Sequence, residues 1–129
     1  MTNVWRVPFV IGGLARLVIG GGYLFVPEWM GGRLAPRIDG HAGARMNLRG
    51  MGGTQAGVAL YTLARARRRE SARTALSLNL LVDGLDLIVS SFLEWRDRGE
   101  FDALVAGDIA VNGSAVLCYT AAAALLRRA

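Results

Sequence analysis

The sequence has one cysteine, one histidine and no lysine, and these shortages exclude several kinds of site. Cys118 alone cannot form an intrachain disulfide or a CxxC redox pair. Cys118 and His41 together cannot supply the usual zinc ligands or a bis-His haem site. We therefore expect no metal site and no cofactor within this chain. A lone His41 in a glycine-rich and proline-rich connection is expected to be a solvated side chain.

All of the positive charge comes from arginine, and the net charge is +5. The basic residues are not interleaved with aromatic residues, and no known nucleic-acid-binding motif is present, so no nucleic-acid partner is expected. Basic connections beside apolar segments instead fit the anionic surface of a membrane.

The 129 residues fit a single domain, 1–129, with a charged fraction of 19% and a mean hydropathy of +0.34. The charges concentrate in connections between four apolar segments, at about 4–26, 44–64, 75–95 and 101–126. Each segment is close to the roughly 20 residues that a helix needs to cross a bilayer. The pattern predicts an all-α fold, a four-transmembrane-helix antiparallel bundle. A water-soluble helical bundle is the alternative.

The orientation follows from the basic connection RARRRESAR, residues 65–73. Arginine-rich connections stay in the cytoplasm, so four spans would place both the N- and C-termini there. Arg127 and Arg128 agree with that side. The first apolar segment lacks a convincing cleavage site and is interpreted as a retained span. The prediction is a multi-pass protein of the cell (plasma) membrane with cytoplasmic termini.

The third apolar segment carries a thin polar stripe. At about 100° per residue of an α-helix, four polar residues fall within about 60° of one another; they are Asn79, Asp83, Asp86 and Ser90. The rest of the helix surface is apolar. This proportion is typical of a helix that faces lipid on one side and a polar protein interior on the other.

The other three segments also carry polar stripes at helical spacing. They are Gly12, Arg16, Gly20 and Tyr23 in the first segment, Arg45, Arg49, Gly52 and Ala56 in the second, and Asp108, Asn112, Ala115 and Tyr119 in the fourth. The glycines of the first stripe predict a close helix approach around Arg16, and a GxxxG pair, Gly53 and Gly57, predicts a second close contact.

The charged residues of these stripes nearly balance in sign: Arg16, Arg45 and Arg49 against Asp83, Asp86 and Asp108. An unpaired charge at the bilayer centre costs at least about 2.5–3.5 kcal/mol, so we expect the charges to pair with one another. Arg45 lies nearer the outer end of its segment, and a place on the outer surface is the alternative for it. The remaining hydrogen-bonding groups would be satisfied by Asn79, Asn112, Tyr23 and Tyr119.

Two interpretations of this polar centre stay open. In the first, ion pairs fix the register and orientation of the helices. In the second, the charges line a pocket that binds a ligand or moves protons; Asp83, Asp86 or Asp108 would then be the acid or base, and Arg16 or Arg49 would hold an anionic or carbonyl group.

Several of these residues also carry a family resemblance. The stretch Arg45–Leu60, with Arg49-Gly50 and Gly57, is followed by Asp83-x-x-Asp86, and the first span has a central Arg16. In these features the chain resembles small uncharacterised four-helix bacterial membrane proteins of the DoxX-like and domain-of-unknown-function type. The resemblance implies a four-span bundle and no settled activity.

The sequence thus predicts a small membrane subunit or a lipid- or small-molecule-binding module. The alternative is a membrane-embedded acid–base enzyme, such as an isomerase, cyclase or hydrolase, acting on an apolar substrate. The expected partners are membrane lipid and an apolar small-molecule ligand, together with a second copy of the chain or a larger membrane complex.

Overall fold

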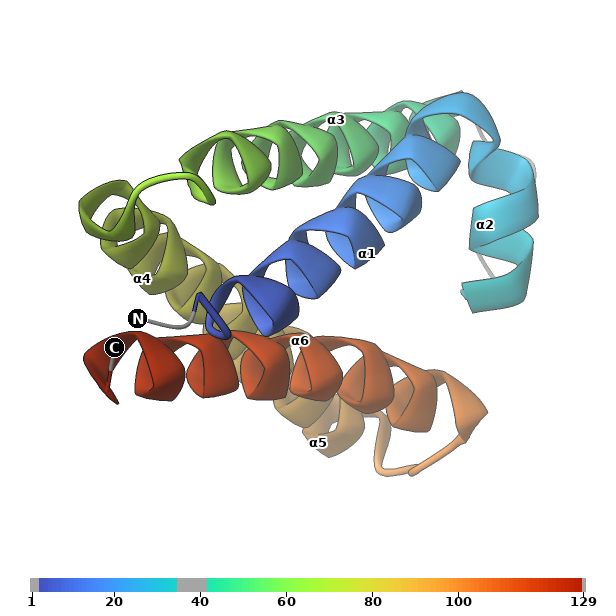
Figure 1. The fold of residues 1–129 in the computed structure, drawn as a ribbon. Coiled ribbons are helices and arrows are strands. Elements are labelled where there is room, and N and C mark those ends of the chain that lie inside the picture. The colour runs from blue at the N-terminus through green and yellow to red at the C-terminus, as the bar shows by residue number, and fades with distance from the viewer. Residues whose placement is uncertain (1–2, 35–41, 129) are drawn as a thin grey trace.

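The computed structural model describes residues 3–34 and 42–128, and the secondary structure of these residues is helical, without a strand (Figure 1). The elements are α1 (Arg6–Phe25), α2 (Pro27–Leu34), α3 (Ala42–Arg65), α4 (Arg69–Asp86), the π-helix η1 (Leu87–Leu93), α5 (Glu94–Arg98) and α6 (Ala103–Arg128). The helices α4, η1 and α5 follow one another without a break. The predicted all-α class is confirmed.

Three of the described helical segments are long and apolar enough to cross a membrane: Arg6–Phe25, Arg69–Asp97 and Val105–Arg128. Their outer surfaces carry large exposed apolar side chains, among them Val18, Phe25 and Leu117, which are 71–77% exposed. Exposed apolar surface of this extent suits contact with lipid. These helices indicate a membrane protein.

The second predicted span, 44–64, corresponds to α3, which is not among these three segments. Its first half carries Arg45, Asn47 and Arg49, and all three are exposed. The prediction of four spans is therefore confirmed for three segments, and the second segment is not apolar enough to count as a span by itself, because polar residues lower its hydropathy. The structure has three apolar helical segments and one long, more polar helix.

The connection 27–43, expected to be a loop, contains the short helix α2. Proline suits the first position of a helix, because the N–H group that it lacks would have no partner there. Glu28 lies in the first turn, where the helix dipole favours a negative charge. Residues 35–41 of that connection, including His41, lie outside the described residues, and residues 42 and 43 already belong to α3.

The connections between the helices lie at two ends of the molecule (Figure 1). The two chain ends and the turn between α3 and α4 lie on one side, and α2 and the connection between α5 and α6 lie on the other. Two hydrogen bonds reinforce the first side. Arg6 Nη2 donates to the Arg67 carbonyl at 2.8 Å, and Arg69 Nη2 donates to the Leu126 carbonyl at 2.9 Å.

Near that end, a small apolar core joins α1, α4 and α6. It is built around three buried aromatic rings: Phe9 meets Trp5 and Tyr119 edge to face, with ring centroids 5.8 and 6.3 Å apart. Small side chains fill the space beside them: Ala72, Ala75 and Ala122 are fully buried. Because alanines bring the helix backbones close, this core places the middle of α1 directly against α4 and α6.

Glycines bring α1 and α3 into backbone contact. A Cβ atom added at Gly20 would lie 2.6 Å from the Ala56 nitrogen, and one added at Gly52 would lie 2.6 Å from the Leu24 nitrogen. The close approach expected of the α1 glycine stripe is therefore confirmed.

The predicted contact through Gly53 and Gly57 is wrong. Nothing lies within 4 Å of a Cβ atom at Gly57, and at Gly53 the nearest atom is 3.8 Å away. The neighbouring pair Gly52 and Ala56 faces α1 instead, about 100° further round the helix.

The glycine contact can be tested by replacing Gly20 with alanine. Because the added Cβ would collide with backbone, the variant should lose about 1–3 kcal/mol of stability, measured as thermal unfolding of the detergent-solubilised protein. The matched control is Gly21→Ala, where nothing lies within 4 Å of the new Cβ. It should be neutral or slightly stabilising, because alanine favours a helix. Equal stability of the two variants would contradict the backbone contact.

Candidate polar site between the helices

The centre of the molecule holds an ion pair between α1 and α4. Arg16 Nη2 donates to Asp83 Oδ1, and the two side chains are only 6% and 4% exposed. Arg16 lies midway along α1, and Gly12, Gly13 and Gly20 around it are buried. The lack of side chains on these glycines lets the neighbouring helices enclose the guanidinium group.

Several polar atoms around this ion pair are buried without a hydrogen-bond partner among the described residues. They are Arg16 Nη1, Asp83 Oδ2 and Asn79 Oδ1. Tyr119 packs over Gly12, where an added Cβ would lie 2.8 Å from the ring, and its hydroxyl lies beside Arg16, with which it interacts electrostatically and by hydrogen bonding. Donors and acceptors of this kind are costly to bury unpaired, so they are available to a polar group of a ligand or to water.

A second polar cluster surrounds Asp108 on α6. Its Oδ2 accepts a hydrogen bond from Ser91 Oγ at 2.7 Å, and its Oδ1 accepts one from Asn112 Nδ2 at 3.1 Å. Asp86 interacts electrostatically with both Arg16 and Asp108 and so connects the two clusters. We call the group Arg16, Asp83, Asp86, Asp108 and Tyr119 the polar centre. Tyr23, which is buried on α1, interacts electrostatically with Asp108 of the polar centre.

The structure leaves Arg45 and Arg49 outside the polar centre. Arg45 Nη1 pairs with Glu28 Oε1 of α2 at 2.8 Å on the surface, and Arg49 is exposed. The reason is where α1 ends: Gly52 of α3 contacts Leu24 in the last turn of α1, so Arg45 and Arg49, on the same face of α3, lie beyond the end of that helix. The expected balance of three arginines and three aspartates is not formed. The polar centre has one arginine and three aspartates.

The π-helix η1 changes which serine reaches the polar centre. The sequence predicted Ser90, four residues after Asp86, whereas the side chain of Ser91 is buried and bonded to Asp108. A π-helix has i→i+5 bonding, so a residue five positions on continues the stripe of the preceding α-helix. The side chain of Ser90 lies outside the described residues. Nothing in the sequence signals this change of register.

Asn79 connects α4 to α3 instead of bonding the charged groups. Its Nδ2 donates to Thr62 Oγ1 and to the Ala75 carbonyl, both at 2.7 Å. Thr62, fully buried, donates in turn to the Val58 carbonyl at 2.7 Å. Thr62 was not anticipated, because a threonine in a helix commonly bonds only to the carbonyl one turn earlier.

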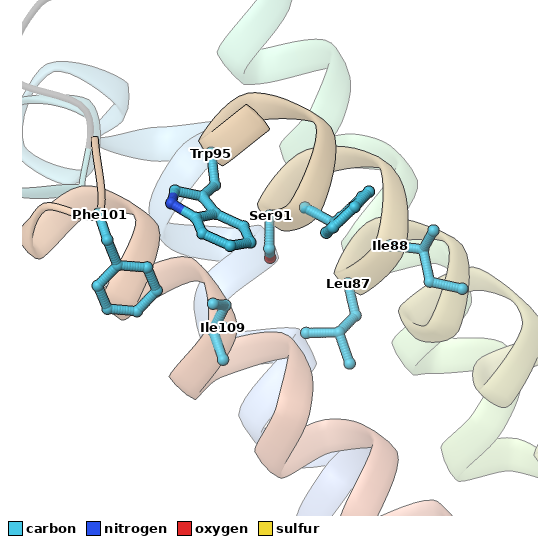
Figure 2. A pocket seen from close by; sticks show the side chains of 7 residues that line it. Leu87, Ile88, Ser91, Trp95, Phe101 and Ile109 are labelled. Atoms are coloured by element: carbon cyan, nitrogen blue, oxygen red, sulfur yellow. The ribbon is translucent and has the colours of Figure 1, made fainter. Parts of the chain in front are cut away.

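A largely apolar groove of about 730 Å³ opens beside the second cluster, between η1–α5 and the first part of α6 (Figure 2). Its lining residues are Leu87, Ile88, Ser91, Phe92, Trp95, Phe101 and Ile109. Trp95 meets Phe92 and Phe101 edge to face, with ring centroids 6.0 and 6.4 Å apart. Ser91 is the polar lining residue and also bonds Asp108, so it connects the groove to the polar centre.

Comparison with protein-family models, curated proteins and solved structures finds no match to this chain. The resemblance to DoxX-like proteins stays a prediction. Among the described residues, no group of three or more His, Cys, Asp or Glu side chains is arranged to hold a metal ion. The function of the chain is therefore inferred from its polar centre and its groove.

The contribution of the buried ion pair to stability can be compared with that of the exposed pair of Arg45 and Glu28. Asp83→Leu or Arg16→Leu alone should destabilise the protein by about 3–5 kcal/mol, because each leaves a buried unpaired charge. The double variant should be more stable than either single variant, since it removes both charges. Thermal unfolding in detergent measures all three.

The matched control is the pair Arg45 and Glu28, whose side chains are 51% and 71% exposed. Replacing either one with glutamine should cost at most about 1 kcal/mol. Additive losses at Arg16 and Asp83, or losses as small as those of the control, would contradict a buried, mutually neutralising pair.

Proposed function

We propose that this chain is an integral membrane protein with four helices in the bilayer and cytoplasmic termini. The helices α1, α4–η1–α5 and α6 supply the apolar spans, and α3 is the fourth, held against α1. The proposal is supported by the grouping of the basic turn 65–73 with both chain ends on one side of the molecule (Figure 1), as arginine-rich connections favour the cytoplasm.

The packing of α3 supports its place beside the spans. A Cβ atom added at Gly13 would lie 2.9 Å from Leu63, and Gly20 contacts Ala56, so α3 runs antiparallel to α1 over much of its length. A helix too polar to insert alone can lie in a bilayer when a neighbour shelters it. Arg45 then lies at the outer end, where it pairs with Glu28.

Within this architecture, we propose that the protein is a binding module for a lipid or an apolar small molecule. The observation that carries the proposal is the pair of unpartnered buried atoms on Arg16 and Asp83, with the Tyr119 hydroxyl beside them. Groups of this kind in a membrane interior are costly and are commonly functional. A polar group of a ligand that both donates and accepts hydrogen bonds would satisfy them.

The contacts favour binding over acid–base catalysis. Asp83 is paired with Arg16, and both oxygens of Asp108 accept hydrogen bonds. Carboxylates held in this way are poorly placed to exchange a proton with a substrate. Asp86 is the remaining acid of the polar centre.

The topology can be tested with two cysteines introduced at exposed glutamates, Glu70→Cys and Glu100→Cys, in a Cys118→Ala background. In intact cells, a membrane-impermeant maleimide should label position 100, and it should label position 70 only after permeabilisation. Labelling of both positions in intact cells, or of position 70 alone, would contradict the orientation.

Ligand binding can be tested by native mass spectrometry after mild detergent extraction. The protein should retain a small amphiphilic molecule, and Tyr119→Phe should lower its retention by up to about tenfold, the loss of one hydrogen bond. The matched control is Tyr61→Phe, on α3 outside the polar centre, where Arg65 lies 4.7 Å from the ring. A protein extracted without any bound molecule, or equal retention by the two variants, would contradict the proposed function.

A further inference from the structure

We infer that the protein has a second binding site, which takes a single-chain amphiphile with a positively charged, hydrogen-bond-donating head group, such as an amine. The apolar chain lies in the groove between η1–α5 and α6, and the head group lies at Ser91 and Asp108. This inference goes beyond the proposed function, because none of the residues that line the groove carries an unpartnered atom of the Arg16–Asp83 site.

The volume and the lining of the groove indicate that it binds the apolar chain of the amphiphile. Its volume of about 730 Å³ is within the range of sites for small molecules, roughly 300–1,000 Å³. Apart from Ser91, the side chains that line it are apolar or aromatic, and Ile88 and Phe92 are more than half exposed (Figure 2). The groove therefore opens sideways, where a chain can enter directly from the lipid.

The charge of the polar centre indicates that the head group is positively charged. Asp86 and Asp108 lie near each other, and Arg16, the arginine of the polar centre, is already paired with Asp83. The polar centre has three aspartates and one arginine, so its net negative charge would repel a carboxylate or phosphate and attract an ammonium group. The low dielectric constant of the membrane interior strengthens both effects.

Ser91 marks the place where the two parts of the ligand would meet. Its side chain is 2% exposed, it lines the groove, and its hydroxyl donates to Asp108. An ammonium group at the inner end of the groove can displace this donor and bond the carboxylate directly, which is a stronger, charge-assisted hydrogen bond. The π-helix supports this position, because Ser91 within it is buried and bonded to Asp108.

Trp95 gives a direct reporter, because it lines the groove. The full chain would be reconstituted in phosphatidylcholine nanodiscs and titrated with two brominated probes of equal chain length, an alkylamine and an alkyl carboxylic acid. The amine should quench tryptophan fluorescence at concentrations at least about tenfold lower than the acid. Trp95→Phe should remove the saturable part of the quenching.

Two variants separate the head-group and chain contacts. Asp108→Asn should reduce the preference for the amine by about tenfold while leaving the acid unaffected or slightly favoured. Ile109→Phe should weaken saturable binding of the amine, because it fills the groove. The matched control is Leu117→Phe on the same helix, whose side chain is 71% exposed and distant from the groove lining; it should bind as the unchanged protein does.

Equal quenching by the two probes, insensitive to Asp108→Asn and Ile109→Phe, would mean that bulk lipid fills the groove, and it would overturn this inference. A preference for the acid would overturn it as well. Neither result would change the retention of a bound molecule measured with Tyr119→Phe. A failure of this inference is therefore distinguishable from a failure of the proposed binding function. If no molecule is retained by the extracted protein and neither probe binds, both proposals fail.

Discussion

The structure depends on the neutralisation of Arg16 by Asp83 where three helices meet. Either charge alone at the centre of a bilayer would cost at least about 2.5–3.5 kcal/mol. The pair is enclosed because buried glycines line α1 around Arg16 and because Tyr119 covers Gly12. The same enclosure leaves further polar atoms without partners, so the contact that stabilises the helices also creates the candidate site.

Much of the fold was predictable from periodicity. The long apolar runs gave the positions of α1, α4–α5 and α6, and the polar stripe correctly placed Asn79 and Asp83 on the buried side of α4. The first half of α3 was harder, since Arg45 and Arg49 share a helix face with Gly52. Helical spacing cannot show where along such a face the neighbouring helix ends. The structure ends that contact before the arginines, and Arg45 pairs with Glu28 instead.

The least predictable part of the site was its outer end. The π-helix η1 shifts the register by one residue, so that Ser91 reaches Asp108 and the groove opens beside it. No residue of LIVSSFL marks this change, because π-bonding depends on tertiary contacts as much as on local sequence. The resulting groove has an apolar lining that Ser91 connects to Asp108, an arrangement that neither the charge balance nor the hydropathy of the sequence had indicated.

The most direct measurement is a charge exchange in native membranes. Arg16→Asp or Asp83→Arg alone places two like charges together, and the variant should fail to accumulate as folded protein, judged by detergent-extracted monodisperse yield. The combined exchange restores one positive and one negative charge at the contact and should recover much of that yield. Normal accumulation of both single variants, or no recovery in the combined one, would contradict the account.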